Sequence, residues 1–211
     1  MGNPRVLRRL PRKLKKDATS APRPEVMERA VAAFLEGAGL SLDEPNLAQT
    51  PKRVVEAWLT EFLDGYRTTA AEALGETYPA PPDSDGELVV ITDLTFRSMC
   101  PHHLLPVTGR AHVAYVPSQR VVGFGRIAAL LDCYAHRLIL QEDLAREVAR
   151  ALAKELQSPA TACLLEAEQA CLRVRGSRQL HARTHAEAYE GRLRTDRDLR
   201  RELWARIGPA K

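Results

Sequence analysis

Apolar residues recur at helical spacing in two stretches of the first third of the chain. Between residues 26 and 40, Val26, Ala30 and Phe34 fall on one stripe, a spacing typical of an amphipathic helix. In the run "TPKRVVEAWLTEFLDGY", Thr50 can cap a helix that has Pro51 at its first position, where proline is well tolerated. The sequence therefore predicts two amphipathic helices before residue 82.

The pattern changes to alternation after residue 86. The runs "ELVVITDLTF" and "TGRAHVAYVP" alternate apolar and polar residues, as half-buried antiparallel strands do. A short strand, "RVVGFG", precedes helical patterns over residues 127–134 and 141–156. The pattern over residues 160–176 predicts a strand that pairs or bends near residue 167. A polar strand region follows, and the charged run "RTDRDLRRELWARI" predicts a last helix. This order predicts an α+β domain with an antiparallel sheet covered on one face.

The run "YPAPPDSDGE" breaks every regular pattern, so we place a boundary near Asp83. Three parts result: a basic tail over residues 1–23, a helical region over 24–82, and a domain over 83–211 that ends in the last helix. The tail carries eight Lys or Arg against one Asp, whereas the whole chain has a formal net charge of +4. We expect a disordered, solvated tail, with weak contact to a polyanion as the alternative. The slightly acidic remainder argues against a nucleic-acid-binding surface.

The composition excludes several other classes of protein. No stretch reaches the roughly 20 apolar residues that cross a bilayer, and no apolar segment follows the basic start as in a secretory signal. Four cysteines in 211 residues do not make a disulfide framework, so we expect a cytoplasmic protein with reduced thiols. Cys133 and Cys163 fall within apolar runs and are expected in the core.

Cys100 and His103 are three residues apart just after a predicted strand. On a tight turn this spacing lets a thiolate and an imidazole point at one zinc ion, but alone it is a weak signal, because histidines are more often surface or core residues. Cys171 strengthens the hypothesis, since it falls in a predicted strand among charged residues that could form the floor of a polar site. Two cysteines and one histidine leave the fourth tetrahedral position open to water, which is typical of a catalytic zinc site.

Six blocks of the sequence resemble the GTP cyclohydrolase I family, from about residue 26 to residue 207. They are "TPKR" (50–53), "CPHHLLP" (100–106), "GRAHVAYVP" (109–117), "LQED" (140–143), "EAEQAC" (166–171) and "RVRG" (173–176). Each block alone is a weak signal, whereas six in the same order are specific. The resemblance implies the tunnelling fold, an antiparallel four-stranded sheet with two helices on one face, here after an N-terminal helical region. It also implies homo-oligomeric rings stacked as a decamer, with active sites shared between subunits.

The resemblance also assigns functional roles to three groups of residues. The ligands of Zn²⁺ would be Cys100, His103 and Cys171. The catalytic group would comprise His102, His103 and Gln169. The group that binds a guanine nucleotide would comprise Gln141, Glu142, Arg53, Arg126 and Arg175. Within it, Glu142 can accept two N–H bonds from the guanine edge, although a carboxylate at the start of a helix can also simply favour the helix dipole.

The family chemistry begins with a zinc-activated water that attacks C8 of GTP. Ring opening gives a formamide, a second hydrolysis releases formate, and recyclisation yields 7,8-dihydroneopterin triphosphate. This sequence departs from the family pattern at several chemical positions: Pro101 stands in place of a glutamate, Gln169 of a proton-donating histidine, Gly125 of a serine and Ala129 of an arginine. An amide cannot deliver a proton near neutral pH.

Three hypotheses are therefore open. The protein could be a divergent cyclohydrolase that completes the reaction or stops at the formamide. It could be a paralogue acting on another purine or pterin. It could also be a non-catalytic ring subunit that binds zinc and a purine.

Overall fold

The computed structural model describes residues 20–82 and 86–208. The chain forms two compact units, with the boundary after Pro51. Most of the predicted basic tail and the predicted boundary at Asp83 lie outside the described residues. No helix in the described ranges is long and apolar enough to span a bilayer.

The first unit contains helix α1, Pro24–Gly37, in agreement with the predicted amphipathic pattern. It begins at Pro24. Proline is tolerated in the first helical turn because the N–H groups of that turn have no hydrogen-bond partner within the helix. None of its side chains is buried, and Phe34 is 75% exposed. Within the described part of the chain, Val26, Ala30 and Phe34 of the apolar stripe are therefore exposed.

A series of short helices begins at the boundary between the units. Helix α2, Thr50–Ala57, continues as the π-helical turn η1, Trp58–Phe62, and is followed by the 3₁₀ turn η2, Asp64–Arg67, and helix α3, Ala70–Leu74. Thr69 caps α3, because its side chain accepts from the backbone of Glu72 while the Glu72 carboxylate accepts from the backbone of Thr69. Strand β1, Thr77–Pro79, then pairs with the short β4, Arg120–Val122.

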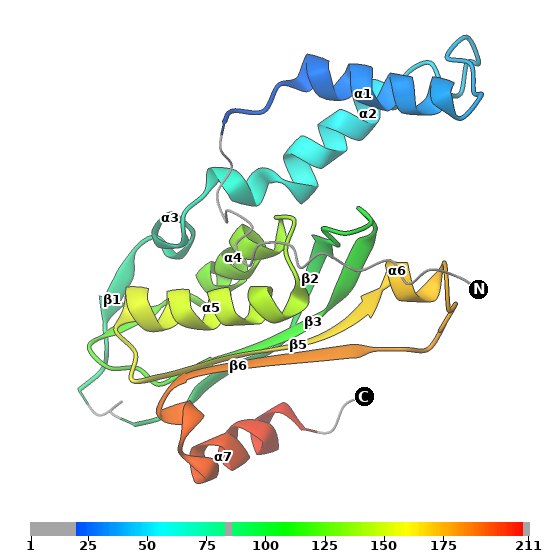
Figure 1. The fold of residues 1–211 in the computed structure, drawn as a ribbon. Helices are drawn as coiled ribbons and strands as arrows, with labels where there is room; N and C mark the ends of the chain where they lie inside the picture. The colour runs from blue at the N-terminus through cyan, green and yellow to red at the C-terminus, as the bar shows by residue number, and fades with distance from the viewer. Residues whose placement is uncertain (1–19, 83–85, 209–211) are drawn as a thin grey trace, which may run out of the picture. The chain divides into compact units, whose positions relative to one another are not determined.

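Four antiparallel strands form the main sheet in the order β2-β3-β5-β6 (Figure 1). Their bounds are Val89–Met99 for β2, Pro106–Tyr115 for β3, Ala160–Gln169 for β5 and Thr184–Gly191 for β6. Helices α4, Phe124–Ala135, and α5, Gln141–Leu156, cover one face of this sheet. The predicted α+β fold with two helices on one face of a four-stranded sheet is confirmed.

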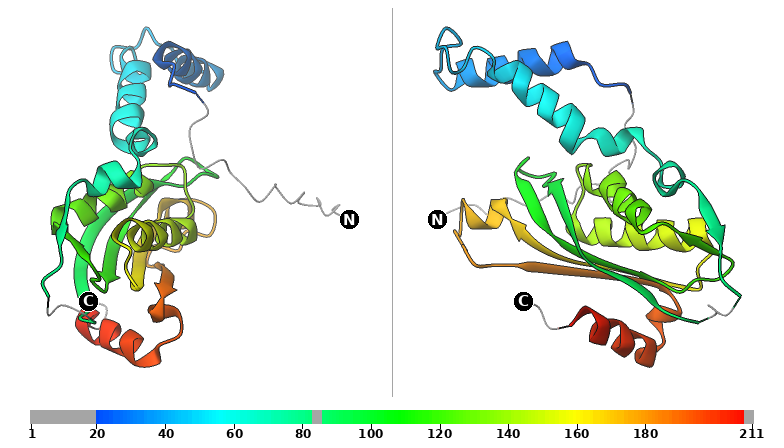
Figure 2. Two further views of the ribbon diagram at one scale, coloured as in Figure 1. Left: turned by 90° about the vertical axis from the view of Figure 1, so that its left-hand side faces the viewer. Right: turned by 180° about the vertical axis from the view of Figure 1, so that it is seen from behind.

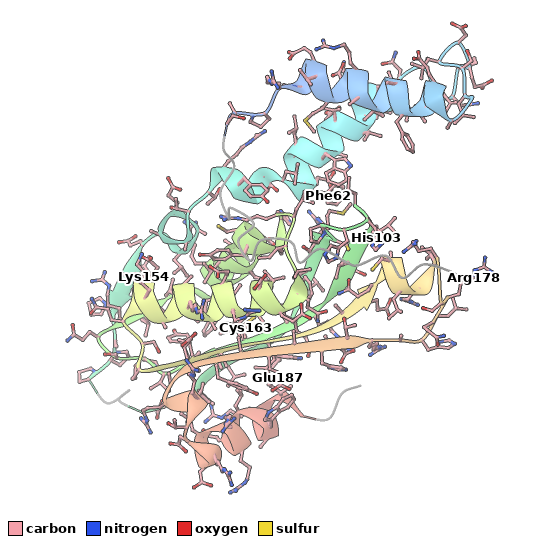
Figure 3. The ribbon with its side chains drawn as sticks, viewed as in Figure 1. Phe62, His103, Lys154, Cys163, Arg178 and Glu187 are labelled. Atoms are coloured by element: carbon pink, nitrogen blue, oxygen red, sulfur yellow. The ribbon has the colours of Figure 1, made fainter. Side chains whose placement is uncertain are left out.

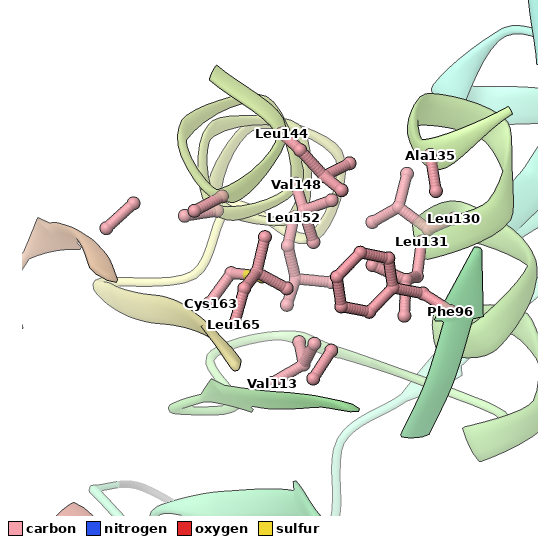
Figure 4. Close-up of a cluster of buried hydrophobic side chains, with 14 of the residues drawn as sticks. Phe96, Val113, Leu130, Leu131, Ala135, Leu144, Val148, Leu152, Cys163 and Leu165 are labelled. Carbon is pink, nitrogen blue, oxygen red and sulfur yellow. The ribbon is translucent and has the colours of Figure 1, made fainter. Parts of the chain in front are cut away.

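The larger hydrophobic core lies between these two helices and the sheet (Figure 4). Leu144, Val148 and Leu152 follow one another at four-residue spacing along α5, so they share the face that points at the strands. Val113 of β3 and Leu165 of β5 meet them from alternate positions of the sheet. The bounds of α5 are those that its apolar pattern predicted.

A second, smaller core lies on the opposite face of the sheet, which the sequence did not predict to be covered. Helix α7, Arg197–Ile207, packs there, on the other side of the sheet from α4 and α5 (Figure 2). Leu199 and Leu203 of α7 are buried with Leu88 and Leu164. The prediction of two helices on one face is confirmed, and the predicted last helix covers the other face.

Replacing Leu203 by alanine tests how far α7 stabilises the fold. Leu203 is fully buried, so we expect Leu203→Ala to lower the free energy of unfolding by about 3 kcal/mol, measured by urea denaturation. Arg201→Ala on the exposed side of the same helix should change it by less than about 0.5 kcal/mol. Equal effects of the two changes would show that α7 is not docked.

Candidate metal centre and active-site cavity

Cys100 and His103 lie on the tight connection between β2 and β3. The amide of Leu104 donates to the carbonyl of Cys100, and the amide of Cys100 donates to the carbonyl of Leu105. Leu104 adopts the left-handed conformation, with φ of 53°, to close this turn. The turn brings Cys100 Sγ to 3.8 Å from His103 Nδ1, as the spacing of the two residues predicted. Figure 3 shows His103 at this end of the sheet.

Cys171 reaches the same place through the pairing of β3 with β5. Val107, just after the turn, lies opposite Gln169, the last residue of β5. The chain then enters a short helical turn, α6, Ala170–Arg173, which carries Cys171. The prediction that Cys171 lies in a strand is wrong, because the chain bends into α6 where β5 ends.

The three predicted ligands suit zinc. The two sulfur atoms and the imidazole nitrogen lie within 4.8 Å of one another, and a tetrahedral zinc ion would set a sulfur and a nitrogen about 3.6 Å apart. Burial and the adjacent Cys100 thiol raise the pKa of Cys171, so a metal must displace a proton to bind it. Burial likewise raises the pKa of Cys163, but that thiol lies within the core beneath α5 and takes no part in the site (Figure 3).

A cavity of about 470 Å³ adjoins this centre, a volume in the range of small-molecule sites. It is lined by residues from the β2–β3 connection, the start of α5, the end of β5 and the start of β6. Predicted site residues among them are Cys100, His102, Gln141, Glu142, Gln169 and Cys171. A smaller cavity of about 100 Å³ beside α7 contains none of the predicted site residues.

Glu142 and Gln141 are placed by the first turn of α5, but their side chains are used differently. Among the described residues the Glu142 carboxylate has no hydrogen-bond or ion-pair partner, so it is available to a ligand in the cavity. The Gln141 amide is engaged inside the protein: its Nε2 donates to the main-chain carbonyls of Leu165 and Thr184. Its Oε1 accepts from Gln169 and Thr184.

The predicted arginines do not all reach the cavity. Arg175 Nη1 lies 3.1 Å from His103 Nε2 and is therefore beside the metal centre. Arg53 on α2 and Arg126 on α4 are exposed and do not line the cavity of this chain. Their predicted contact with phosphate would need a second copy of the chain or a movement of these side chains.

Two polar residues of the cavity escaped sequence reasoning. Thr184 shares the hydrogen bonds of Gln141 and Gln169, and no local signal marked it. Ser98 is only 4% exposed, and its hydroxyl has no partner in the described part of the chain. Because buried hydroxyls are normally paired, Ser98 is a candidate contact for a ligand.

The comparison with known proteins identifies the class to which this fold and site belong. The family model of GTP cyclohydrolase I matches residues 27–208. The protein named GTP cyclohydrolase 1 of Chromobacterium violaceum is 43% identical over 176 residues, which cover 83% of this chain and 84% of that protein. The one of Ralstonia nicotianae is 41% identical, with 83% of each chain covered, and the one of Deinococcus radiodurans is 35% identical over 184 residues, covering 87% of this chain and 84% of that one. The chain therefore belongs to the GTP cyclohydrolase I family.

Replacing Cys171 by alanine tests the metal centre. Losing one of three ligands should lower bound zinc from about one ion per chain to less than a tenth of that, measured by elemental analysis after exhaustive dialysis. Cys163→Ala removes a thiol from the core and should keep the full zinc content. Equal zinc in the two variants would place the metal elsewhere.

Proposed function

We propose that this protein is a zinc-dependent cyclohydrolase that opens the imidazole ring of GTP at C8, on the way to 7,8-dihydroneopterin triphosphate. The observation that carries this proposal is the cluster of Cys100, His103 and Cys171 beside a cavity that also contains Glu142. Zinc held by these three residues would supply Lewis acidity and an activated water for attack on C8. The substrate class follows from membership of the family.

Glu142 orients the guanine. A carboxylate without a partner in its own chain can accept two parallel hydrogen bonds, from N1–H and the 2-amino group of guanine. The first amide groups of α5 have no partner within the helix and can donate to the guanine O6. The Gln141 side chain has no free donor or acceptor for the base, so its predicted contact would have to come from its main chain.

Arg175 is the cation best placed to bind the triphosphate. An imidazole that binds a metal through Nδ1 keeps its proton on Nε2 and cannot accept a hydrogen bond there. The guanidinium of Arg175 can only donate, so it would turn from His103 towards the anionic ligand when zinc binds. Arg53 and Arg126 are further candidates, on condition that a neighbouring subunit brings them to the site.

His102 is the candidate for proton transfer. It is exposed and lines the cavity, and histidine is the side chain that enzymes most often use for proton transfer. Gln169 cannot replace the proton-donating histidine expected at its position. This observation favours a second outcome, in which the reaction stops at the formamide.

We also propose a homo-oligomer, with a decamer as the expected form, in the cytoplasm. Arg53 and Arg126 do not line the cavity of their own chain, and a neighbouring subunit that brings them to the site supports this proposal. All four cysteines are free thiols, as expected of a protein in a reducing compartment.

Replacing Glu142 by glutamine tests guanine recognition. The amide loses one acceptor and the negative charge, so we expect the affinity for GTP to fall at least tenfold, measured by calorimetry. Asp143→Asn is the matched control, since Asp143 lies in the same helical turn, pairs with Arg146 and does not line the cavity. If both variants lose affinity equally, Glu142 acts through the helix dipole and not on the base.

Replacing Gln169 by histidine tests the missing proton donor. General acid catalysis contributes about 10²–10⁴-fold in rate, so we expect Gln169→His to raise formate release or dihydropterin formation from GTP at least tenfold. Formate is measured enzymatically and the pterin by its absorbance. No gain in a variant with full zinc content would mean that the cavity does not hold C8 beside the metal.

A further inference from the structure

The orientation of the Gln141 amide is fixed by the main chain. Its Nε2 lies 3.2 Å from the carbonyl oxygen of Leu165 and 3.0 Å from that of Thr184. Carbonyl oxygens only accept, so the nitrogen of the amide has to face them. A flipped amide would set its oxygen against both carbonyls. Gln141 Oε1 is therefore turned towards Gln169.

Gln141 in turn fixes the amide of Gln169. Gln169 Nε2 lies 2.9 Å from Gln141 Oε1 and 3.4 Å from the hydroxyl of Thr184. The Thr184 hydroxyl donates to Gln141 Oε1, so it can accept from Gln169 at the same time. Both N–H groups of Gln169 are thus used. Its Oε1 has no partner in the described ranges, and Gln169 lines the cavity.

We propose that Gln169 is a specificity-determining residue that presents a hydrogen-bond acceptor, and no donor, to the ligand, and that Gln141 and Thr184 are the positioning residues that hold it so. This inference rests on the proposed function. Gln169 lies two residues before Cys171 and lines the same cavity, so with C8 at the metal centre we place its acceptor beside N7. The inference then predicts a preference for ligands that carry an N–H where guanine has N7.

The chemistry of ring opening gives this preference a consequence. In GTP, N7 is an acceptor and is repelled by a facing carbonyl oxygen. Addition of water across the N7–C8 bond places hydrogen on N7 and hydroxyl on C8. When the C8–N9 bond then breaks, the hydroxyl proton passes to N9, and the former N7 becomes the N–H of a formamide. Gln169 therefore favours the hydrated and ring-opened forms over GTP, and it retains the formamide in the site.

Two nucleotides that cannot be opened at C8 test the inference. In 8-oxo-GTP position 7 is an N–H donor, and in 7-deaza-GTP it is a C–H, while both keep the guanine edge and the triphosphate. We expect the zinc-loaded full-length protein to bind 8-oxo-GTP at least tenfold more tightly than 7-deaza-GTP, as measured by calorimetry. Gln169→Leu should lower this affinity ratio at least fivefold. The C8 oxygen of 8-oxo-GTP is presented equally to the wild-type protein and to Gln169→Leu. A change in the affinity ratio between the two proteins therefore reports on Gln169.

The positioning residues are tested by the same ratio. Thr184→Val and Gln141→Leu should each lower the affinity ratio two- to threefold, because each change loosens the Gln169 amide. Circular dichroism checks that both variants are folded. Gln179→Leu, an exposed glutamine outside the cavity, should leave the ratio unchanged.

The outcomes separate the inference from the proposed function. An unchanged ratio in Gln169→Leu overturns the acceptor role, while the affinity for both nucleotides still supports a guanine site. If the affinity ratio falls in Gln169→Leu but not in Thr184→Val or Gln141→Leu, the positioning role of Gln141 and Thr184 is overturned. Failure of the wild-type protein to bind either nucleotide overturns the proposed function itself.

Discussion

The site depends on the pairing of β3 with β5. Their register sets Val107 opposite Gln169, and this brings Cys171, two residues further on, to the turn that carries Cys100 and His103. Gly109 allows the strands to approach here, because a Cβ at this position would lie 2.0 Å from the carbonyl oxygen of Glu166. A slip of one residue would send Gln169 to the other face of the sheet and separate the three zinc ligands.

Helix α5 links the stability of the fold to the site. Its inner face packs on the sheet through Leu144, Val148 and Leu152, and its first turn carries Gln141 and Glu142. Gln141 also donates to main-chain carbonyls of β5 and β6, which ties the start of the helix to the ends of these strands. The turn that carries Glu142 is therefore held against the sheet by hydrogen bonds as well as by the core, as a precisely placed binding group requires.

Gln169 gives the cavity a neutral amide at the position where the family pattern has a histidine. A side-chain amide satisfies the hydrogen bonds of Gln141 and Thr184, and it leaves a neutral acceptor facing the ligand. The Cys100, His103 and Cys171 cluster and Glu142 adjoin the same cavity, so the groups proposed to bind zinc and guanine lie beside this amide. The amide of Gln169 is therefore the feature of the cavity by which the proposed reaction of this chain differs from the family pattern.

The sequence by itself determined the periodic elements and the local metal-binding pair. Strand alternation, the bounds of α5 and the turn that joins Cys100 to His103 all depend on residues close in the chain, so pattern and spacing suffice. Only the tertiary structure decided that Cys171 lies in a helical turn, that α7 covers the second face, and that Arg53 and Arg126 stay away from the cavity of their own chain. It also decided which way the amides of Gln141 and Gln169 point, because that orientation comes from carbonyls of strands distant in sequence. Hydrogen-bond partners brought together by sheet register leave no periodic signal along the chain.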